Sequence, residues 1–188
     1  MRKLIVWNLM TLDGMFDGQK SWDLGWHEDV YGPELEQLSL DQLKSIGALV
    51  FGRVTYEGMA AYWTPETGPI AEFMNGLPKI VFSRTLSKVG WNNSTLLKEN
   101  AAEEISRLKQ QGGKDLFIFG SANLSSTFTQ AGLIDEYRIC LTPHVLGGGS
   151  PLFKPSSEKM KMKLVKSTPL KSGCVILYYQ PESRSAAA

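Results

Sequence analysis

The segment 48–59, ALVFGRVTYEGM, places a fixed positive charge and a hydroxyl group where a buried strand gives way to a helix. The apolar run ends at Gly52, and Arg53 and Thr55 follow. A glycine at this point lets a ligand approach the backbone, and a helix N-terminus favours an anion. A guanidinium group suits a phosphate monoester, and a threonine hydroxyl can donate to a phosphate oxygen. The segment predicts a phosphate site, although a solvated arginine after a glycine turn also explains these residues.

Two later segments have the same strand-to-turn character. Ser83 and Arg84 end a second apolar run; alone they indicate a surface arginine, but with Arg53 they predict two neighbouring strands that present arginine to one phosphorylated ligand. In the segment 116–128 an apolar run enters a turn of small residues directly before a predicted helix, where backbone N–H groups can meet a pyrophosphate. The residues of this turn are Gly120, Ser121, Ala122 and Asn123. It is neither a G-x-G-x-x-G nor a Walker motif.

Two further segments are candidates for contact with a substrate. Three consecutive glycines, 147–149, follow a later strand and are costly in conformational entropy. We expect Gly147 and Gly148 to belong to a loop that closes over a ligand, with a flexible surface loop as the alternative. Trp22, Trp26 and His27 place three large rings close together in the chain, where they could stack on a planar heterocycle or pack in the core.

Several other chemistries find no support in the sequence. The segment 11–18 matches only part of a calcium loop, because Met15 and Leu24 stand where oxygen ligands are required. The only histidines are His27 and His144, and no Cys/His cluster has the spacing of a zinc site. No G-x-S-x-G sequence occurs, so a hydrolase triad is not indicated. We therefore expect no metal site.

The order of secondary structure indicates the fold class. Helices and strands alternate for about the first 130 residues, and strands alone follow. One of the helices follows Asn100, which has capping-box spacing to Glu103. The predicted strands are 3–10, 48–51, 79–83, 115–119, 135–142, 161–168 and 173–180. This order predicts an α/β fold with a mostly parallel central sheet, helices on both faces and an antiparallel C-terminal edge. Ligands bind beyond the carboxyl ends of parallel strands, where the phosphate segments lie.

Length and composition favour one soluble domain. The 188 residues suffice for a single domain, which we place at 1–180, with 181–188 as a disordered tail. The formal net charge of +1 and the absence of a basic stripe argue against a nucleic-acid partner, and no apolar run is long enough to span a membrane. Cys140 and Cys174 lie in apolar segments, which favours buried thiols and a reducing cytoplasm.

Taken in order, these segments resemble the dihydrofolate reductase fold family, in a three-layer arrangement. In that family a strand leads into G-R-x-T at the start of a helix, which matches Gly52, Arg53 and Thr55. The resemblance implies that Arg53 contacts the 2′-phosphate of NADPH and that Thr55 reaches its pyrophosphate. It also implies that Ser83 and Arg84 lie at the adenosine end and that 120–123 holds the pyrophosphate.

The segments TLDGMFDG and VLGGGSPLF resemble, more closely, the reductase domain of the riboflavin-biosynthesis enzymes. This resemblance implies an NADPH-dependent reductase of a planar heterocycle, such as 5-amino-6-(5-phosphoribosylamino)uracil or a folate. Asn8 and Thr11 could orient the nicotinamide or the substrate, and Asp13 is a candidate proton donor. The alternative is a nucleotide-binding or sensor module that has kept the cofactor site without turnover. The resemblance also implies a homodimer, for which the C-terminal edge strands with Tyr178 and Tyr179 are a candidate interface.

Overall fold

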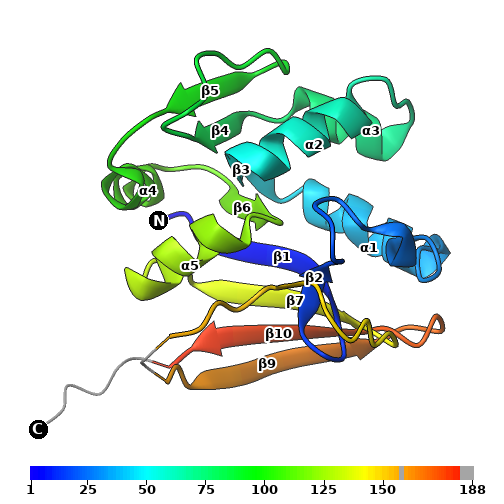
Figure 1. The fold of residues 1–188 in the computed structure, drawn as a ribbon. Coiled ribbons are helices and arrows are strands. Elements are labelled where there is room, and N and C mark those ends of the chain that lie inside the picture. Colours follow the sequence, from blue (N-terminus) through cyan, green and yellow to red (C-terminus); the bar gives the residue numbers. More distant parts are fainter. Residues whose placement is uncertain (157–158, 183–188) are drawn as a thin grey trace, which may run out of the picture.

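An eight-stranded sheet forms the centre of the protein in a computed structural model that describes residues 1–156 and 159–182 (Figure 1). The strand order is β5-β4-β3-β6-β1-β7-β10-β9. The strands are β1 (Leu4–Thr11), β3 (Ile46–Gly52), β4 (Lys79–Phe82), β5 (Ser94–Leu97), β6 (Asp115–Phe119), β7 (Glu136–Thr142), β9 (Met162–Pro169) and β10 (Val175–Pro181). Neighbouring strands from β5 to β7 are parallel, whereas β10 is antiparallel to both β7 and β9. The predicted α/β class with an antiparallel C-terminal edge is confirmed.

Helices cover both faces of the sheet (Figure 1). The helices are α1 (Pro33–Leu43), α2 (Arg53–Trp63), α3 (Pro69–Gly76), α4 (Ala101–Gln110) and α5 (Ala122–Gln130). Successive residues of a strand point to opposite faces, so β1 takes part in two cores. Leu4 and Val6 pack in the core that contains residues of α4 and α5, and Ile5 packs in the core that contains residues of α1, α2 and α3. The three-layer arrangement is therefore built by the period-2 pattern of apolar strand residues.

Short elements beside the main sheet connect two of its loops. Strands β2 (Met15–Asp17) and β8 (Ser150–Pro151) pair antiparallel, which joins the N-terminal loop to the end of the glycine loop. A short 3-10 helix, η1 (Gly25–His27), follows β2. None of these elements is expected from the sequence pattern, because each is too short to show periodicity.

Three local expectations need correction. Asn100 precedes α4 in a left-handed conformation and makes no side-chain capping bond, so the predicted capping box is wrong. Tyr178 and Tyr179 lie on β10, one strand in from the edge strand β9. Strand β10 continues to Pro181, one residue into the expected tail, and the tail residues 183–188 lie outside the described residues.

Two findings bear on the expectations from composition. Over residues 1–156 and 159–182 the structure has no helix with the length and apolar character that crossing a membrane requires. Cys140 and Cys174 are buried free thiols, as predicted from their apolar surroundings.

Candidate functional site

The two predicted phosphate turns form one site at the carboxyl ends of β3 and β6. Helix α2 begins directly after Gly52 and α5 begins directly after Ser121, and neither N-terminus has a side-chain cap. The Gly52 N–H donates to Ser121 Oγ at 3.0 Å, and the Ser121 N–H donates to Thr55 Oγ1 at 2.9 Å. These hydrogen bonds hold two helix N-termini side by side. Such N-termini favour anions, and two together suit a diphosphate.

Gly120 makes the close approach of these turns possible. Its φ of +61° is in the left-handed region, and a Cβ at this position would lie 2.9 Å from Thr55 Cγ2. The buried Asn8 side chain also holds this turn, because its Oδ1 accepts a hydrogen bond from the Gly120 N–H at 2.6 Å. Its Nδ2 in turn reaches the Gly120 carbonyl oxygen at 3.5 Å. The structure thus places Asn8 as a residue that positions the glycine turn.

The predicted cations lie at neighbouring strand ends. Gly52 pairs in register with Phe82, so Arg53 and Ser83 follow adjacent positions of β3 and β4. Arg53 is 45% exposed, and its Nη1 forms an ion pair with Glu57 Oε2 at 2.8 Å. Ser83 Oγ accepts hydrogen bonds from two backbone N–H groups of its own turn, those of residues 85 and 86. Arg84 is exposed and makes no ion pair with any residue that the structure describes. Both arginines are therefore accessible to an anion.

Asp13 fixes the glycine loop. The Thr11 hydroxyl donates to Asp13 Oδ1 at 2.5 Å, and the backbone N–H groups of Leu146 and Gly147 also donate to this carboxylate. The hydrogen bond from Thr11, followed by those from the loop, holds the pKa of Asp13 below its usual value. An ionised carboxylate with a lowered pKa clamps a loop well and is a poor proton donor at neutral pH. Thr11, fully buried beside it, orients the carboxylate.

The three rings that the sequence places together occupy two different places. Trp22, in the loop after β2, packs its ring against α2, where its Nε1–H donates to the Val54 carbonyl oxygen at 3.4 Å. A Cβ at Gly58 would overlap the Trp22 indole, so the missing side chain of Gly58 creates the space for this ring. Asp17 fixes the backbone of the loop, because its carboxylate accepts hydrogen bonds from the N–H groups of Trp22 and Asp23. The loop 17–23 is thereby held against the helix that begins at Arg53.

Substituting alanine for Gly58 tests this contact. An exposed helical Gly→Ala change normally stabilises a protein by up to about 1 kcal/mol. Here we expect Gly58→Ala to destabilise the wild-type chain, because the new methyl group displaces the Trp22 ring. In a Trp22→Ala background the same change should regain the ordinary stabilisation. Urea denaturation of the wild type, the two single variants and the double variant measures the coupling free energy between Trp22 and residue 58. An equal gain in stability in both backgrounds would show that the Trp22 ring does not occupy the space beside Gly58.

Trp26 and His27 pack with His144 beside the carboxyl end of β7. The Trp26 and His27 ring centroids are 4.2 Å apart, and Trp26 is 5.9 Å from His144. Burial, with a smaller contribution from His144, lowers the pKa of His27 to about 4. His144 itself lies 3.2 Å from Thr142 Oγ1 and 3.4 Å from an oxygen of the exposed Asp29. The three rings therefore pack against one another and form a local aromatic cluster.

The lowered pKa of His27 predicts a pH-dependent stability. The unfolded chain binds a proton below about pH 6.5, whereas the folded chain resists protonation of His27 until about pH 4. Stability should therefore fall as the pH drops through this window, by roughly 2–3 kcal/mol from His27. The measurement is the free energy of unfolding at pH 7 and pH 4.5 for the wild type and His27→Gln. The variant should lose less stability on acidification, and equal losses would contradict the buried neutral state.

A cleft of about 550 Å³ lies between the loop 18–23 and the glycine loop. Trp22 and Gly148 line it, together with Leu146 and the rest of the loop. Its volume is in the range of small-molecule sites. Gly147, Trp26 and His27 are not among the lining residues, although Gly147 lies between Leu146 and Gly148, which are. Within the described ranges, no group of three or more His, Cys, Asp or Glu side chains could hold a metal ion.

Some site residues have no clear signal in the sequence. Gly58 sits in the interior of a helix, where an isolated glycine suggests only reduced helix propensity. Asp17 reads as part of an incomplete calcium loop, and its actual role is to cap the turn that carries Trp22. Both roles depend on contacts between segments, which a local pattern does not encode.

Comparisons with known proteins identify the fold and the family of the chain. The uncharacterized protein YyaP of Bacillus subtilis (strain 168) is 31% identical over 183 residues, which cover 95% of this chain and 94% of that protein. A putative riboflavin biosynthesis protein from Shewanella sp. PV-4 has a TM-score of 0.79 at 25% identity, covering 96% of this chain and 99% of that chain. Dihydrofolate reductase from Enterococcus faecalis, solved as a complex with NADP(H), shares the fold with a TM-score of 0.63 at 16% identity and 96% coverage of both chains. Residues 2–176 match the family model of the RibD C-terminal domain. The protein belongs to the RibD C-terminal domain family.

Proposed function

We propose that this protein is an NADPH-dependent reductase of a planar nitrogen heterocycle or of its ribosyl derivative. One observation carries the proposal: the uncapped N-termini of α2 and α5 are joined by the bonds of Ser121 to Gly52 and Thr55. This pair of helix starts is suited to a pyrophosphate. Membership of the RibD C-terminal domain family and the fold shared with an NADP(H)-binding reductase support the same proposal.

The residues present fit such a cofactor. The first-turn N–H groups of α2 and α5 would hold the pyrophosphate. The absence of a side chain at Gly120 lets the two helix starts lie close together. Thr55 Oγ1 accepts from the Ser121 N–H, so its own proton is available to a phosphate oxygen. Arg53 would pair with the 2′-phosphate, and Ser83 and Arg84 would border the adenosine. When bound, NADPH supplies the hydride.

The cleft beside the glycine loop is the proposed substrate site. Trp22 and Gly148 would contact the heterocycle. Asn8 would hold the turn at Gly120 in position through its hydrogen bond to the Gly120 N–H. Asp13, in its ionised form, would hold the loop through Leu146 and Gly147. In this proposal Asp13 and Thr11 act as positioning residues, and the proton of the reduced product comes from solvent.

A second candidate function is a nucleotide-binding module without turnover. The lowered pKa of Asp13 favours it, because the most obvious acid near the cleft is unsuited to proton donation at neutral pH.

Cofactor oxidation decides between the two functions. NADPH consumption is followed at 340 nm with pterins, pyrimidine ribosides and quinones as substrates. A reductase oxidises NADPH with at least one of them. A module binds NADPH and oxidises it with none, and failure to bind NADPH at about 1 mM would contradict both proposals.

A further inference from the structure

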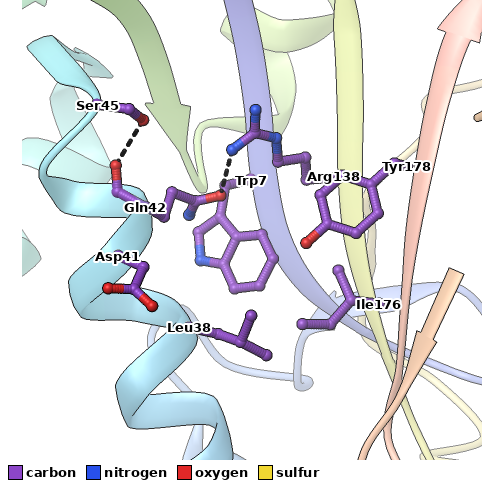
Figure 2. A pocket seen from close by; sticks show the side chains of 8 residues that line it. All are labelled: Trp7, Leu38, Asp41, Gln42, Ser45, Arg138, Ile176 and Tyr178. Carbon is purple, nitrogen blue, oxygen red and sulfur yellow. Dashed lines mark hydrogen bonds between the residues drawn. The ribbon is translucent and has the colours of Figure 1, made fainter. Parts of the chain in front are cut away.

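A second cavity, of about 200 Å³, lies between α1 and the sheet (Figure 2). Its walls come from α1, β1, β7 and β10. In Figure 2 the Trp7 indole lies between Gln42 and Leu38 of α1 and Tyr178 and Ile176 of β10. Trp7 precedes Thr11 by four positions on β1, or about 13 Å along the strand. The cavity is therefore separate from the cleft at the carboxyl ends of the strands.

An arginine borders this cavity in a setting that fixes its guanidinium group. The Arg138 side chain is only 20% exposed, and its Cζ lies 5.1 Å from the Phe117 ring centroid and 5.6 Å from that of Tyr178. Its Nε donates to Glu136 Oε1 at 2.6 Å, and its Nη1 donates to Gln42 Oε1 at 3.0 Å. These contacts leave the rotamer of Arg138 with little freedom, so the group is pre-organised.

The local charge is positive. Glu136 is shared, because Lys3 Nζ also lies 3.6 Å from its second oxygen. Arg138 and Lys3 thus carry two positive charges against the single carboxylate of Glu136. At the rim, Asp41 is paired with Lys44 at 2.8 Å, and this pair adds no net charge. Glu136 therefore pairs with the half-exposed Lys3 as well as with Arg138, and the remaining positive charge favours an anionic ligand.

Two lining residues carry hydrogen-bond donors without a partner among the residues that the structure describes: the Trp7 indole N–H and the Tyr178 hydroxyl. The second terminal nitrogen of Arg138 also has no partner among these residues. Burial raises the pKa of Tyr178, so its phenol keeps its proton at neutral pH. The lining thus combines aromatic and aliphatic walls with free donors.

We propose that this cavity binds a small aromatic carboxylate. An apolar cavity of about 150 Å³ can hold a benzene ring, so the volume here suits one ring with a small substituent. Trp7 and Tyr178 provide aromatic surface for the ring, and Leu38 and Ile176 provide aliphatic surface. Arg138 and the free donors select a carboxylate over a neutral or cationic substituent. The site is independent of the proposed reductase function.

Benzoate is the probe, and the Trp7 indole N–H is the reporter. In ¹H–¹⁵N spectra of the full ¹⁵N-labelled chain, this resonance is identified by its loss in Trp7→Phe. Benzoate should shift it saturably, with a dissociation constant of about 0.5–10 mM for a ligand of this size. Benzyl alcohol, without the charge, and cyclohexanecarboxylate, without the planar ring, should each bind at least about fivefold more weakly.

Variants locate the interaction. Arg138→Lys should weaken benzoate binding about fivefold or more, because lysine lacks the planar fork. Tyr178→Phe, a change that preserves the ring, should weaken it about two- to fivefold. The matched control is Arg107→Lys on α4, which lies in an exposed ion pair with Glu104 and should bind benzoate like the wild type.

Three results would overturn the proposal. The first is the absence of a saturable Trp7 shift at about 20 mM benzoate. The second is a shift confined to the Trp22 or Trp26 indole, which would place benzoate near the cleft. The third is equal binding of benzyl alcohol. None of these measurements uses NADPH, so their failure leaves the proposed reductase function untouched.

Discussion

Replacing Gly120 by alanine is expected to weaken NADPH binding by at least about 100-fold while the protein stays folded. The new Cβ would lie 2.9 Å from Thr55 Cγ2, so the Thr55 side chain or one of the two turns must move. That movement breaks the hydrogen bond from Ser121 to Thr55 and separates the starts of α2 and α5. Each charge-assisted bond to a phosphate contributes roughly 1.5–3 kcal/mol, so the loss of two accounts for the expected effect. Isothermal titration of each variant with NADPH gives the dissociation constant.

Gly132→Ala is the matched control for this experiment. Gly132 has a similar φ of +66°, and no atom lies within 4 Å of a Cβ built there. Gly132→Ala therefore carries the backbone strain, of about 1 kcal/mol in stability, without the contact to Thr55. It should bind NADPH like the wild type. A folded Gly120→Ala protein with wild-type affinity would remove the pyrophosphate from this turn.

Arg53→Ala should weaken NADPH binding by roughly 10- to 150-fold, because a charge-assisted bond to phosphate contributes about 1.5–3 kcal/mol. NADH lacks the 2′-phosphate, so its affinity should change little. The existing Arg53–Glu57 pair is half-exposed and contributes at most about 1 kcal/mol, so a phosphate can displace Glu57. Arg53→Lys should restore only part of the preference, since lysine lacks the planar fork.

Two comparisons sharpen this prediction. Arg84→Ala removes the other exposed cation at the strand ends and should have the smaller effect on the ratio of the two dissociation constants. Rising ionic strength should reduce the NADPH preference of the wild type, because an exposed ion pair is screened. Equal weakening of NADPH and NADH by Arg53→Ala would make Arg53 structural and Arg84 the stronger candidate for the phosphate.

The sequence predicts the fold well where elements are long and periodic. The apolar runs of β1, β3 and β6 are largely buried on both faces, so they stand out as hydrophobic stretches. Strand β5, with four residues and only partial burial, leaves no such signal. The failure at Asn100 has a different cause: its backbone is left-handed, whereas a capping residue is normally extended, and the side chain makes no capping bond.

The candidate site also contains features that the sequence predicts and features that it does not. The turns at Gly52 and Gly120 are local patterns, so the sequence predicts them, and their meeting follows from β3 and β6 being neighbours. The role of Asp13 is not visible locally, because its partners at Leu146 and Gly147 are far away in the chain. The same holds for Trp22, whose place depends on the absence of a side chain at Gly58. Residue types predict the chemistry of the site, and long-range packing decides which side chains hold its loops.

The central claim is that the starts of α2 and α5 together hold the pyrophosphate of NADPH. The most direct test is a titration of the ¹⁵N-labelled protein with NADPH, followed through the backbone amides. We predict saturable shifts of the amide resonances of residues 53–55 at the start of α2 and 122–124 at the start of α5, with one common dissociation constant. Saturable shifts at only one of the two helix starts, or at neither, would contradict the claim.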